Sequence, residues 1–312
     1  MSKYLDPKAD LTFKKVFGEH ADLLKSFLNA LLPLKPGQEI ESLEYIPNEL
    51  VPENPGKKNS IVDVRCYDTF GRQFIVEMQM HWTQAYMQRA LFNTSKAFVG
   101  TMKRGFDYEE VRPVYSLNIV NSIAFPDLKD EFYNRFVPTN VEHPEYTIDG
   151  FEMIFIELPK FRASTVADKK MMVLWLRFLT EINEQTKETP QELLDNADIN
   201  KAMSILEVSA YDDMQRYSYD KFWDEVSCER TLVAGHFRKG REEGLAEGRA
   251  EGRAEGRAEG RAEGRAEGRA EGRAEGERSA NENMARSMKK DGMPVDVISK
   301  YTRLSVEEIE KL

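Results

Sequence analysis

The chain has 312 residues, of which 41% are hydrophobic, and its formal net charge is −10. This apolar content is that of a globular protein, and the length allows one large domain with an appendage, or two domains. No apolar run reaches the length of a membrane span, and the N-terminal residues contain no apolar core of a secretory signal. We therefore expect a cytoplasmic protein with no membrane partner, in which Cys66 and Cys228 are buried thiols rather than a disulfide.

The charge and the histidines limit the kinds of site that the chain can carry. Its four histidines are too scattered for the ligand spacing of a zinc site. The acidic balance weighs against non-specific nucleic-acid binding, which depends on Lys and Arg neutralising phosphates. A local basic surface remains available from Arg65, Arg72, Arg89, Lys96, Lys103 and Arg104.

The first predicted element is an amphipathic helix over residues 9–32, where apolar residues recur at helical spacing. Pro33 and the following LKPG end this helix. Asp10 stands where an N-cap is expected, since a short acidic side chain can accept from the free N–H groups of the first turn. Residues 38–52 predict a first strand, and the polar, Pro- and Gly-rich residues 51–59 predict a loop.

Residues 60–81, SIVDVRCYDTFGRQFIVEMQMH, predict a β-hairpin, because two apolar-rich runs flank a short turn. A three-residue loop centred on Phe70 puts Gly71 at the last loop position, where a left-handed conformation favours glycine. One face is then apolar, pairing Cys66 with Phe74, Val64 with Val76 and Val62 with Met78. The other face pairs Tyr67 with Gln73, Arg65 with Ile75, Asp63 with Glu77 and Ile61 with Gln79. A slip of one residue would scramble both faces, so the pattern favours one register.

This register makes Asp63 and Glu77 direct cross-strand neighbours, with Cβ atoms about 5 Å apart. Two like charges at that distance destabilise the strand pair and raise one pKa unless a cation lies between them. Gln79 shares their face because side chains alternate along a strand. Such a carboxylate pair with a polar neighbour is suited to a hard divalent cation such as Mg²⁺. The alternative is a surface pair of carboxylates bridged by Arg65 or a lysine.

A second long helix is predicted over residues 82–104, with Gly105 closing it. Gln88 and Arg89 lie on this helix and could reach a phosphate, although a surface or salt-bridging arginine is an equal reading of Arg89. Strands follow at 112–120 and within 131–157, and helices at 168–183, about 190–211 and 212–240. This order indicates an α/β fold with a mixed sheet flanked by helices.

From Ala246 the chain repeats AEGR seven times, to Arg273. Regular glycine disfavours a helix and the other three residue types favour it, so this tandem repeat predicts a marginal solvated helix or a flexible spacer. The last residues predict short helices ending at Gly292, spanning 294–301 and starting at Ser305, where Glu308 completes a capping box. This tail is either helix-turn-helix-like or a module for homo-oligomerisation or docking; its acidic last helix favours the second reading. We expect domains at 1–240, 241–277 and 278–312.

Several motifs together resemble the PD-(D/E)xK nucleases, and more closely their Rpn-type branch of recombination-promoting nucleases and transposases. They are DLTFKKVFG at residues 10–18, the pattern VD-x13-ExQ carried by Asp63, Glu77 and Gln79, and the later runs RPVYSLNIV and FEMIFIELPKF. The resemblance covers about residues 4–240 and implies a restriction-endonuclease-like fold. It also implies a Mg²⁺- or Mn²⁺-dependent DNA endonuclease linked to recombination or transposition, with no small-molecule cofactor.

The resemblance assigns roles to individual residues. Asp63 and Glu77 would bind the metal with the backbone carbonyl of Met78, Asp10 would be a third acidic member, and Gln79 would orient the attacking water. Many relatives have lysine where Gln79 stands, and an amide cannot carry charge or act as a base. A catalytically silent DNA- or protein-binding regulatory module is therefore the alternative function. RNA as substrate also stays open, because phosphodiester chemistry is the same.

Overall fold

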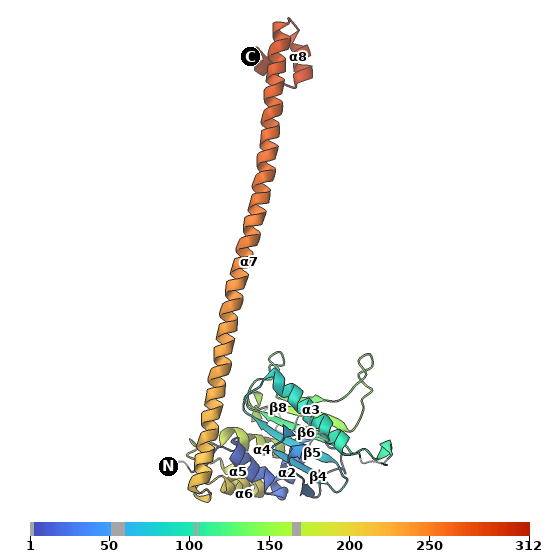
Figure 1. Cartoon of the computed structure of the whole chain (residues 1–312), viewed down its shortest axis with the longest axis vertical. Helices are drawn as coiled ribbons and strands as arrows, with labels where there is room; N and C mark the ends of the chain where they lie inside the picture. The colour runs from blue at the N-terminus through green and yellow to red at the C-terminus, as the bar shows by residue number, and fades with distance from the viewer. Residues whose placement is uncertain (1–2, 51–59, 103–104, 106, 164–169) are drawn as a thin grey trace. The chain divides into compact units, whose positions relative to one another are not determined.

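The computed structural model describes residues 3–50, 60–102, 105, 107–163 and 170–312. These form two compact units, divided between Thr231 and Leu232. The first contains a six-stranded sheet in the order β1–β4–β5–β6–β8–β7 (Figure 1). Its strands are β1 (Leu43–Tyr45), β4 (Val64–Asp68), β5 (Gln73–Gln79), β6 (Val114–Val120), β7 (Tyr133–Phe136) and β8 (Phe151–Glu157). β5, β6 and β8 run parallel and the other pairings are antiparallel, which confirms the predicted mixed sheet.

The predicted hairpin register is confirmed along the body of the hairpin. β4 and β5 pair Val64 with Val76, Arg65 with Ile75, Cys66 with Phe74 and Tyr67 with Gln73. Gly71 has φ +74°, and its N–H donates to the carbonyl of Asp68 at 2.9 Å. The turn therefore needs glycine for the reason that the sequence indicates, since a side chain disfavours this left-handed conformation.

The pairing predicted beyond Val64 is wrong. β3 (Ser60–Ile61) pairs with β2 (Glu49–Leu50) and not with β5, so Ile61 does not face Gln79. The N–H of Val62 donates to the carbonyl of Asn48 at 3.1 Å, and Val62 packs with Ile75 instead of lying opposite Met78. The predicted strand over 38–52 is likewise two short strands, β1 and β2, with Pro47 between them. Proline has no N–H for a ladder, and here the chain leaves the large sheet.

The predicted helix over residues 9–32 is three pieces. α1 (Asp10–Phe13) continues into a π-helix, η1 (Lys14–Gly18), and α2 (Ala21–Leu31) begins after a break at Glu19 and His20. The N-cap of α1 is Ala9, so the prediction of an Asp10 cap is wrong. The predicted stop before Pro33 is correct, since α2 ends at Leu31.

The remaining helices and turns follow the predicted order with shifted ends. α3 (Gln84–Gly100) ends before the expected Gly105, because Thr101 already bonds back to Phe98 and Val99. The others in this unit are η2 (Tyr108–Glu110), η3 (Leu158–Lys160), α4 (Lys170–Glu181), α5 (Gln191–Leu194), α6 (Ala197–Ile205) and η5 (Val208–Ala210). The predicted loop at 51–59 and the cations Lys103 and Arg104 lie outside the described residues.

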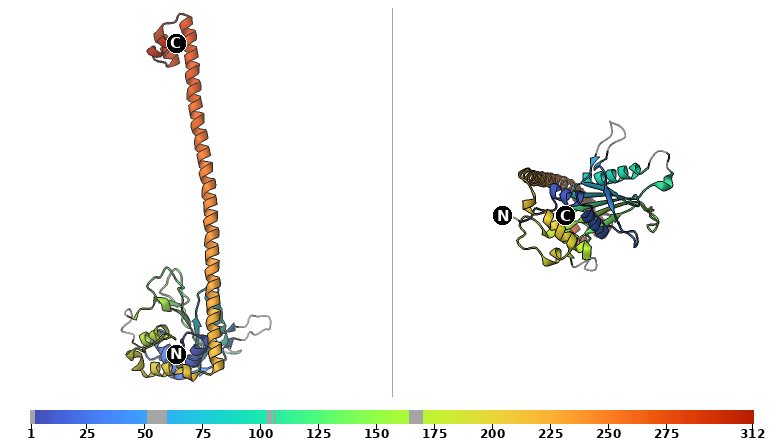
Figure 2. Two further views of the ribbon diagram at one scale, coloured as in Figure 1. Left: turned by 90° about the vertical axis from the view of Figure 1, so that its left-hand side faces the viewer. Right: turned by 90° about the horizontal axis from the view of Figure 1, so that it is seen from below.

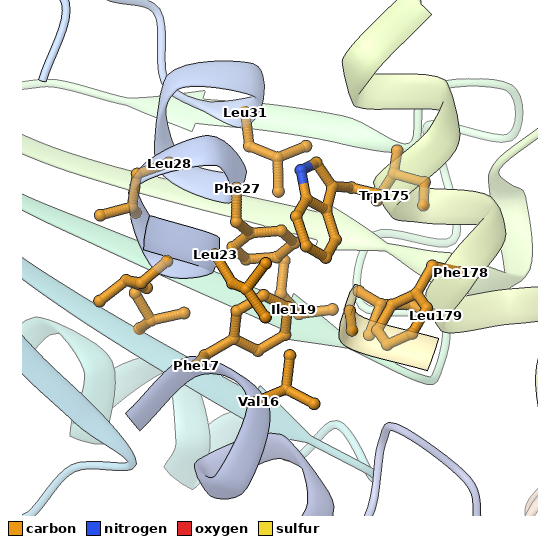
Figure 3. Packing of buried hydrophobic residues seen from close by; sticks show 14 of the residues in the cluster. Val16, Phe17, Leu23, Phe27, Leu28, Leu31, Ile119, Trp175, Phe178 and Leu179 are labelled. Carbon is orange, nitrogen blue, oxygen red and sulfur yellow. The ribbon is translucent and has the colours of Figure 1, made fainter. Parts of the chain in front are cut away.

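Helices cover both faces of the sheet (Figures 1 and 2). On one face, Phe17, Phe27 and Trp175 pack together above Ile119, with 4.4 Å between the ring centroids of Phe17 and Phe27 (Figure 3). α3 covers the other face, where Ala97 packs against Ile75. Burial of apolar side chains on both faces stabilises the sheet by roughly 25 cal/mol per Å². This is why β5, β6 and β8 are apolar along most of their length.

The second unit is helical. The helix predicted over 212–240 is α7 (Asp213–Lys290), which continues through the AEGR repeat. After Gly292, with φ +79°, come α8 (Val295–Thr302) and α9 (Val306–Lys311), and α9 begins with the predicted Ser305–Glu308 capping box. Ile298, Leu304 and Ile309 form a small core with Ala285. The three-domain division and the spacer role of the repeat stay predictions.

The structure also bears on the two cysteines and on the expected lack of a membrane span. Cys66 and Cys228 are both free, and Cys66 is buried as predicted, but Cys228 is exposed on α7. Burial raises the pKa of the Cys66 thiol to about 12, so it stays protonated. Within the part of the chain that the structure describes, no helix has the length and apolarity needed to cross a membrane.

Candidate active site

The candidate site lies where the hairpin ladder ends, at the carboxyl end of β5. Val64 and Val76 form the last pair between β4 and β5, and Glu77 follows directly on β5. Asp63 occupies the bend that precedes β4. Because β5 and β6 are parallel, Glu77 also lies beside Asn118 of β6. Carboxyl ends of parallel strands are a usual place for sites in α/β folds.

Beyond Val64 none of the described strands pairs with β5 on its β4 side, and the Asp63 carboxylate takes that position. Its Oδ2 accepts from the backbone N–H of Met78 at 2.7 Å, at the position predicted for a bond with Val62. Asn48 holds the bend from the other side: its carbonyl accepts from Val62, and its Nδ2 donates to the carbonyl of Asp63 at 2.8 Å. Asp63 and Glu77 are therefore neighbours as predicted, but through a side chain that replaces a strand pair.

Glu77 is buried, with only 6% of the residue exposed. Its Oε1 accepts one long hydrogen bond of 3.5 Å from Asn93 Nδ2 of α3. The Oδ1 of Asn93 is itself buried without a hydrogen-bond partner among the described residues. Asn118 lies beside Glu77 but bonds another residue, since its Oδ1 accepts from the Tyr86 hydroxyl at 2.8 Å.

The pKa values of both carboxyl groups are raised. Burial is the main cause for Asp63, and it outweighs the Met78 N–H and the cations Lys14 and Arg89, which favour the charged form. Burial is also the main cause for Glu77, and the neighbouring charge of Asp63 raises its pKa further. The predicted like-charge repulsion is thus present, and it adds to the effect of desolvation.

Neither carboxylate forms an ion pair with any residue that the structure describes, so the alternative of a surface pair bridged by Arg65 or a lysine finds no support there; Arg65 bonds Pro47 and Gln73 instead. The buried Glu157 at the end of β8 has the partners that are typical of a structural carboxylate, a cation and a backbone N–H. Its Oε1 accepts from Lys160 at 2.8 Å, and its Oε2 accepts from the N–H of Ala124 at 2.6 Å. A buried carboxylate without such a cation destabilises the fold. Asp63 and Glu77 therefore form a cation-deficient pair.

Gln79 and Arg89 form a second layer beside this pair. Arg89 of α3 donates to Gln79 Oε1 at 2.7 Å, and its guanidinium lies 4.8 Å from the Tyr86 ring centroid. The Nε2 of Gln79 donates to the carbonyl of His81 at 2.9 Å. Arg89 is exposed on α3, in agreement with the surface reading, but Gln79 and the Tyr86 ring hold its guanidinium, and it forms no ion pair with either acid. Gln88, also predicted from the helix, lies exposed on α3.

Asp10 reaches the site only through Lys14. The two form an ion pair of 2.7 Å between Oδ1 and Nζ, and about half of the Asp10 side chain is exposed. The charge of Asp10 contributes to the raised pKa of Asp63, which indicates that the two groups are close.

The predicted basic surface is not assembled as expected. Arg72 is buried and paired with Asp68 at 2.6 Å. Lys96 donates to the carbonyl of Leu50, and Arg65 donates to Gln73 Oε1 at 3.1 Å. Of the described members of that set, only Arg89 acts on the pKa values of Asp63 and Glu77. Neutralisation of phosphates by a broad basic face therefore finds little support among the described members of this set.

Comparison with known proteins identifies the family. A family model described as "PD-(D/E)XK nuclease family transposase" matches residues 7–228, which is more than half of the chain. The chain belongs to this family. Searches of curated proteins and of solved structures returned no match. The mixed sheet flanked by helices is consistent with the PD-(D/E)XK fold, and Asp63 and Glu77 lie within the matched residues.

Nucleases of this superfamily generally use divalent metals, and the donor set fits such an ion. No group of three or more His, Cys, Asp or Glu side chains suited to a metal occurs among the described residues. Mg²⁺ needs fewer, because it keeps several waters and binds through one or two carboxylates with substrate phosphates. The orphaned Oδ1 of Asn93 beside Glu77 is a further oxygen for such a water shell.

The sequence did not predict a role at the site for Asn48, Asn93 or Lys14. Asn48 lies 15 residues from Asp63 and Asn93 lies 16 residues from Glu77, and no local pattern singles them out. Lys14 belongs to the run DLTFKKVFG. The helical spacing of this run accounts for its apolar residues but indicates no role for its lysines.

Proposed function

We propose that this chain is a metal-dependent DNA endonuclease that acts in recombination or transposition. The observation that carries the proposal is the cation-deficient pair of Asp63 and Glu77, held at a gap in the sheet. The Glu77 carboxylate is buried and that of Asp63 is partly buried, and neither has an ion-pair partner among the described residues, so a bound cation would complete the arrangement. Membership of the nuclease family of transposases supports DNA as the substrate.

Asp63 and Glu77 would hold the metal, Mg²⁺ or Mn²⁺, with the backbone carbonyl of Met78. In a strand, the N–H and C=O of one residue point to the same side. The Met78 N–H points to Asp63, so its carbonyl faces the same gap. When bound, the metal would lower the pKa of a water and neutralise charge on the phosphate under attack.

The reaction is hydrolysis of a phosphodiester. The oxygen of the attacking water forms a bond to phosphorus while the P–O bond to the leaving sugar oxygen breaks. The water loses one proton and the leaving oxygen takes one up, so the reaction consumes only water. Gln79 has one amide N–H beyond its bond to His81, and this N–H would orient the water. Arg89, fixed by Gln79 and Tyr86, would contact a neighbouring phosphate.

Nicking of supercoiled plasmid by the purified full chain tests this proposal. We expect cleavage with Mg²⁺ or Mn²⁺, none with EDTA, and a loss of at least ~100-fold in Asp63→Asn and in Glu77→Gln, because several kcal/mol of charge stabilisation disappear. Asp127→Asn is the matched control, since it makes the same isosteric change at an exposed position.

The other outcomes are equally informative. DNA binding without cleavage under any metal would support the silent binding module, for which the neutral Gln79 is the structural argument. Cleavage of a single-stranded RNA but not of plasmid would replace DNA by RNA as the substrate. Cleavage that persists in Glu77→Gln would mean that the active site lies elsewhere.

A further inference from the structure

Lys14 occupies an unusual stretch of backbone beside the site. It is the first residue of the π-helix η1, and η1 packs against β4. A Cβ added to Gly18 at the end of η1 would lie 3.8 Å from Val64 Cγ2 and 3.9 Å from Lys14 Cβ. Lys14 is therefore carried close to Val64, the residue that follows Asp63. Short π-helical turns inside helices are rare and occur frequently at functional sites.

The charges around Lys14 are those of the candidate site. Burial by itself would lower the pKa of Lys14, but the hydrogen bond and charge of Asp10, with the charges of Asp63 and Glu77, outweigh it and raise the pKa. The Lys14 charge in turn lowers the pKa of Asp63 and of Glu77. Among the described residues, Lys14 and Arg89 both favour the charged forms of the two acids, and the elements that carry them pack on opposite faces of the sheet.

We propose that Lys14 is a catalytic residue of this nuclease: its ammonium supplies, from the N-terminal π-helix, the mobile positive charge that Gln79 cannot supply from β5. This inference rests on the proposed cleavage of DNA. Lys14 would contact the scissile phosphate or the attacking water and stabilise the negative charge that develops there. It transfers no proton in this role.

The geometry leaves the ammonium available. A lysine ammonium has three N–H donors, and Asp10 takes one of them at 2.7 Å. The side chain is 40% exposed, so a substrate can reach it, and its flexible stem allows it to adjust. Arg89 is a poorer candidate for this role, because its planar guanidinium already bonds Gln79 and stacks on Tyr86.

A simple surface ion pair does not explain this placement. An exposed ion pair at i,i+4 contributes little to stability. The neighbouring Lys15 shows the ordinary alternative, since it lies over the Tyr211 ring at 4.1 Å and bonds the carbonyl of Ala210 at 3.4 Å. The two adjacent lysines thus have different surroundings: Lys15 contacts Tyr211 and Ala210, whereas Lys14 pairs with Asp10.

The test compares Lys14→Met, Lys14→Arg and the matched control Lys15→Met in the full chain. Three measurements are made on each: plasmid cleavage with Mg²⁺, Mn²⁺ affinity by calorimetry and the melting temperature. We expect Lys14→Met to cleave ~100-fold more slowly, as for loss of one donor to a transition state. Its Mn²⁺ affinity should stay equal or rise, because a cation beside the ligands is removed. Lys14→Arg should cleave at least ~10-fold faster than Lys14→Met, because it keeps the positive charge. Lys15→Met should cleave at the wild-type rate.

Two results would overturn the role of Lys14. One is a Lys14→Met chain that cleaves at the wild-type rate. The other is a Lys14→Met chain in which Mn²⁺ affinity and melting temperature fall together with cleavage, since that pattern indicates a structural residue. A wild-type chain that binds Mn²⁺ but cleaves no DNA is a separate outcome: it overturns the proposed nuclease activity itself, and this role with it.

Discussion

The carboxylate of Asp63 accepts a hydrogen bond of 2.7 Å from the backbone N–H of Met78. A side chain thereby takes the position that a strand would otherwise occupy. The ladder of β4 and β5 stops at Val64, whereas β5 stays paired with β6 through Glu77 as far as Gln79. The same bond gives Asp63 a fixed orientation, which a metal ligand needs.

We expect the metal-free chain to lose stability as the pH rises. The folded state raises the pKa of Asp63 and Glu77, so it binds more protons than the unfolded state between the ordinary carboxyl pKa of about 4 and the raised values. The contribution to the free energy of unfolding is therefore greatest below about pH 4 and falls across that window. Melting temperatures at a series of pH values in EDTA measure it, and Mg²⁺ should flatten the curve.

Glu77→Gln is the control for this pH dependence. The variant removes the buried charge, so at pH 8 it should be more stable than metal-free wild type by at least about 1.4 kcal/mol, the equivalent of one pKa unit. Mg²⁺ should no longer raise its melting temperature. An unchanged pH slope in this variant would show that other groups cause the dependence.

Asn48→Ala should loosen the bend that carries Asp63. The variant loses the 2.8 Å bond from Nδ2 to the Asp63 carbonyl and keeps the backbone bond from Val62. One such hydrogen bond is worth about 1 kcal/mol, so urea unfolding should show a loss of that size. Mn²⁺ affinity should fall too, because the carboxylate is less well oriented. Equal Mn²⁺ affinity in wild type and variant would mean that the Met78 bond alone orients Asp63.

Lys160→Met should destabilise the chain strongly, in contrast to Glu77→Gln. Lys160 donates to Glu157 and to the carbonyls of Phe125 and Leu128, and both members of the ion pair are buried. Removing one partner of a buried ion pair costs about 3–5 kcal/mol. Urea unfolding checks this value, and the double variant with Glu157→Gln should recover part of the loss. A single variant as stable as wild type would contradict the structural role assigned to this pair.

Much of the fold was predictable because local chemistry and burial agree. The hairpin register followed from Gly71 and from the alternation of apolar residues, and both have local physical causes. The predictions failed where distant partners compete. Val62 bonds Asn48 rather than β5, and the N-terminal helix breaks into a π-helix and a second helix that packs beneath Trp175.

By itself, the sequence determined the mixed sheet, the register of the hairpin from Val64 to Gln73, and the family motif. These depend on spacing along one or two adjacent strands. Only the tertiary structure decided that Asp63 reaches Met78 through its side chain, that Asn48 and Asn93 bond the two acids, and that the π-helix beginning with Lys14 packs against β4. The physical reason is that these contacts join segments whose separation is set by how helices pack on the sheet, which no local pattern encodes.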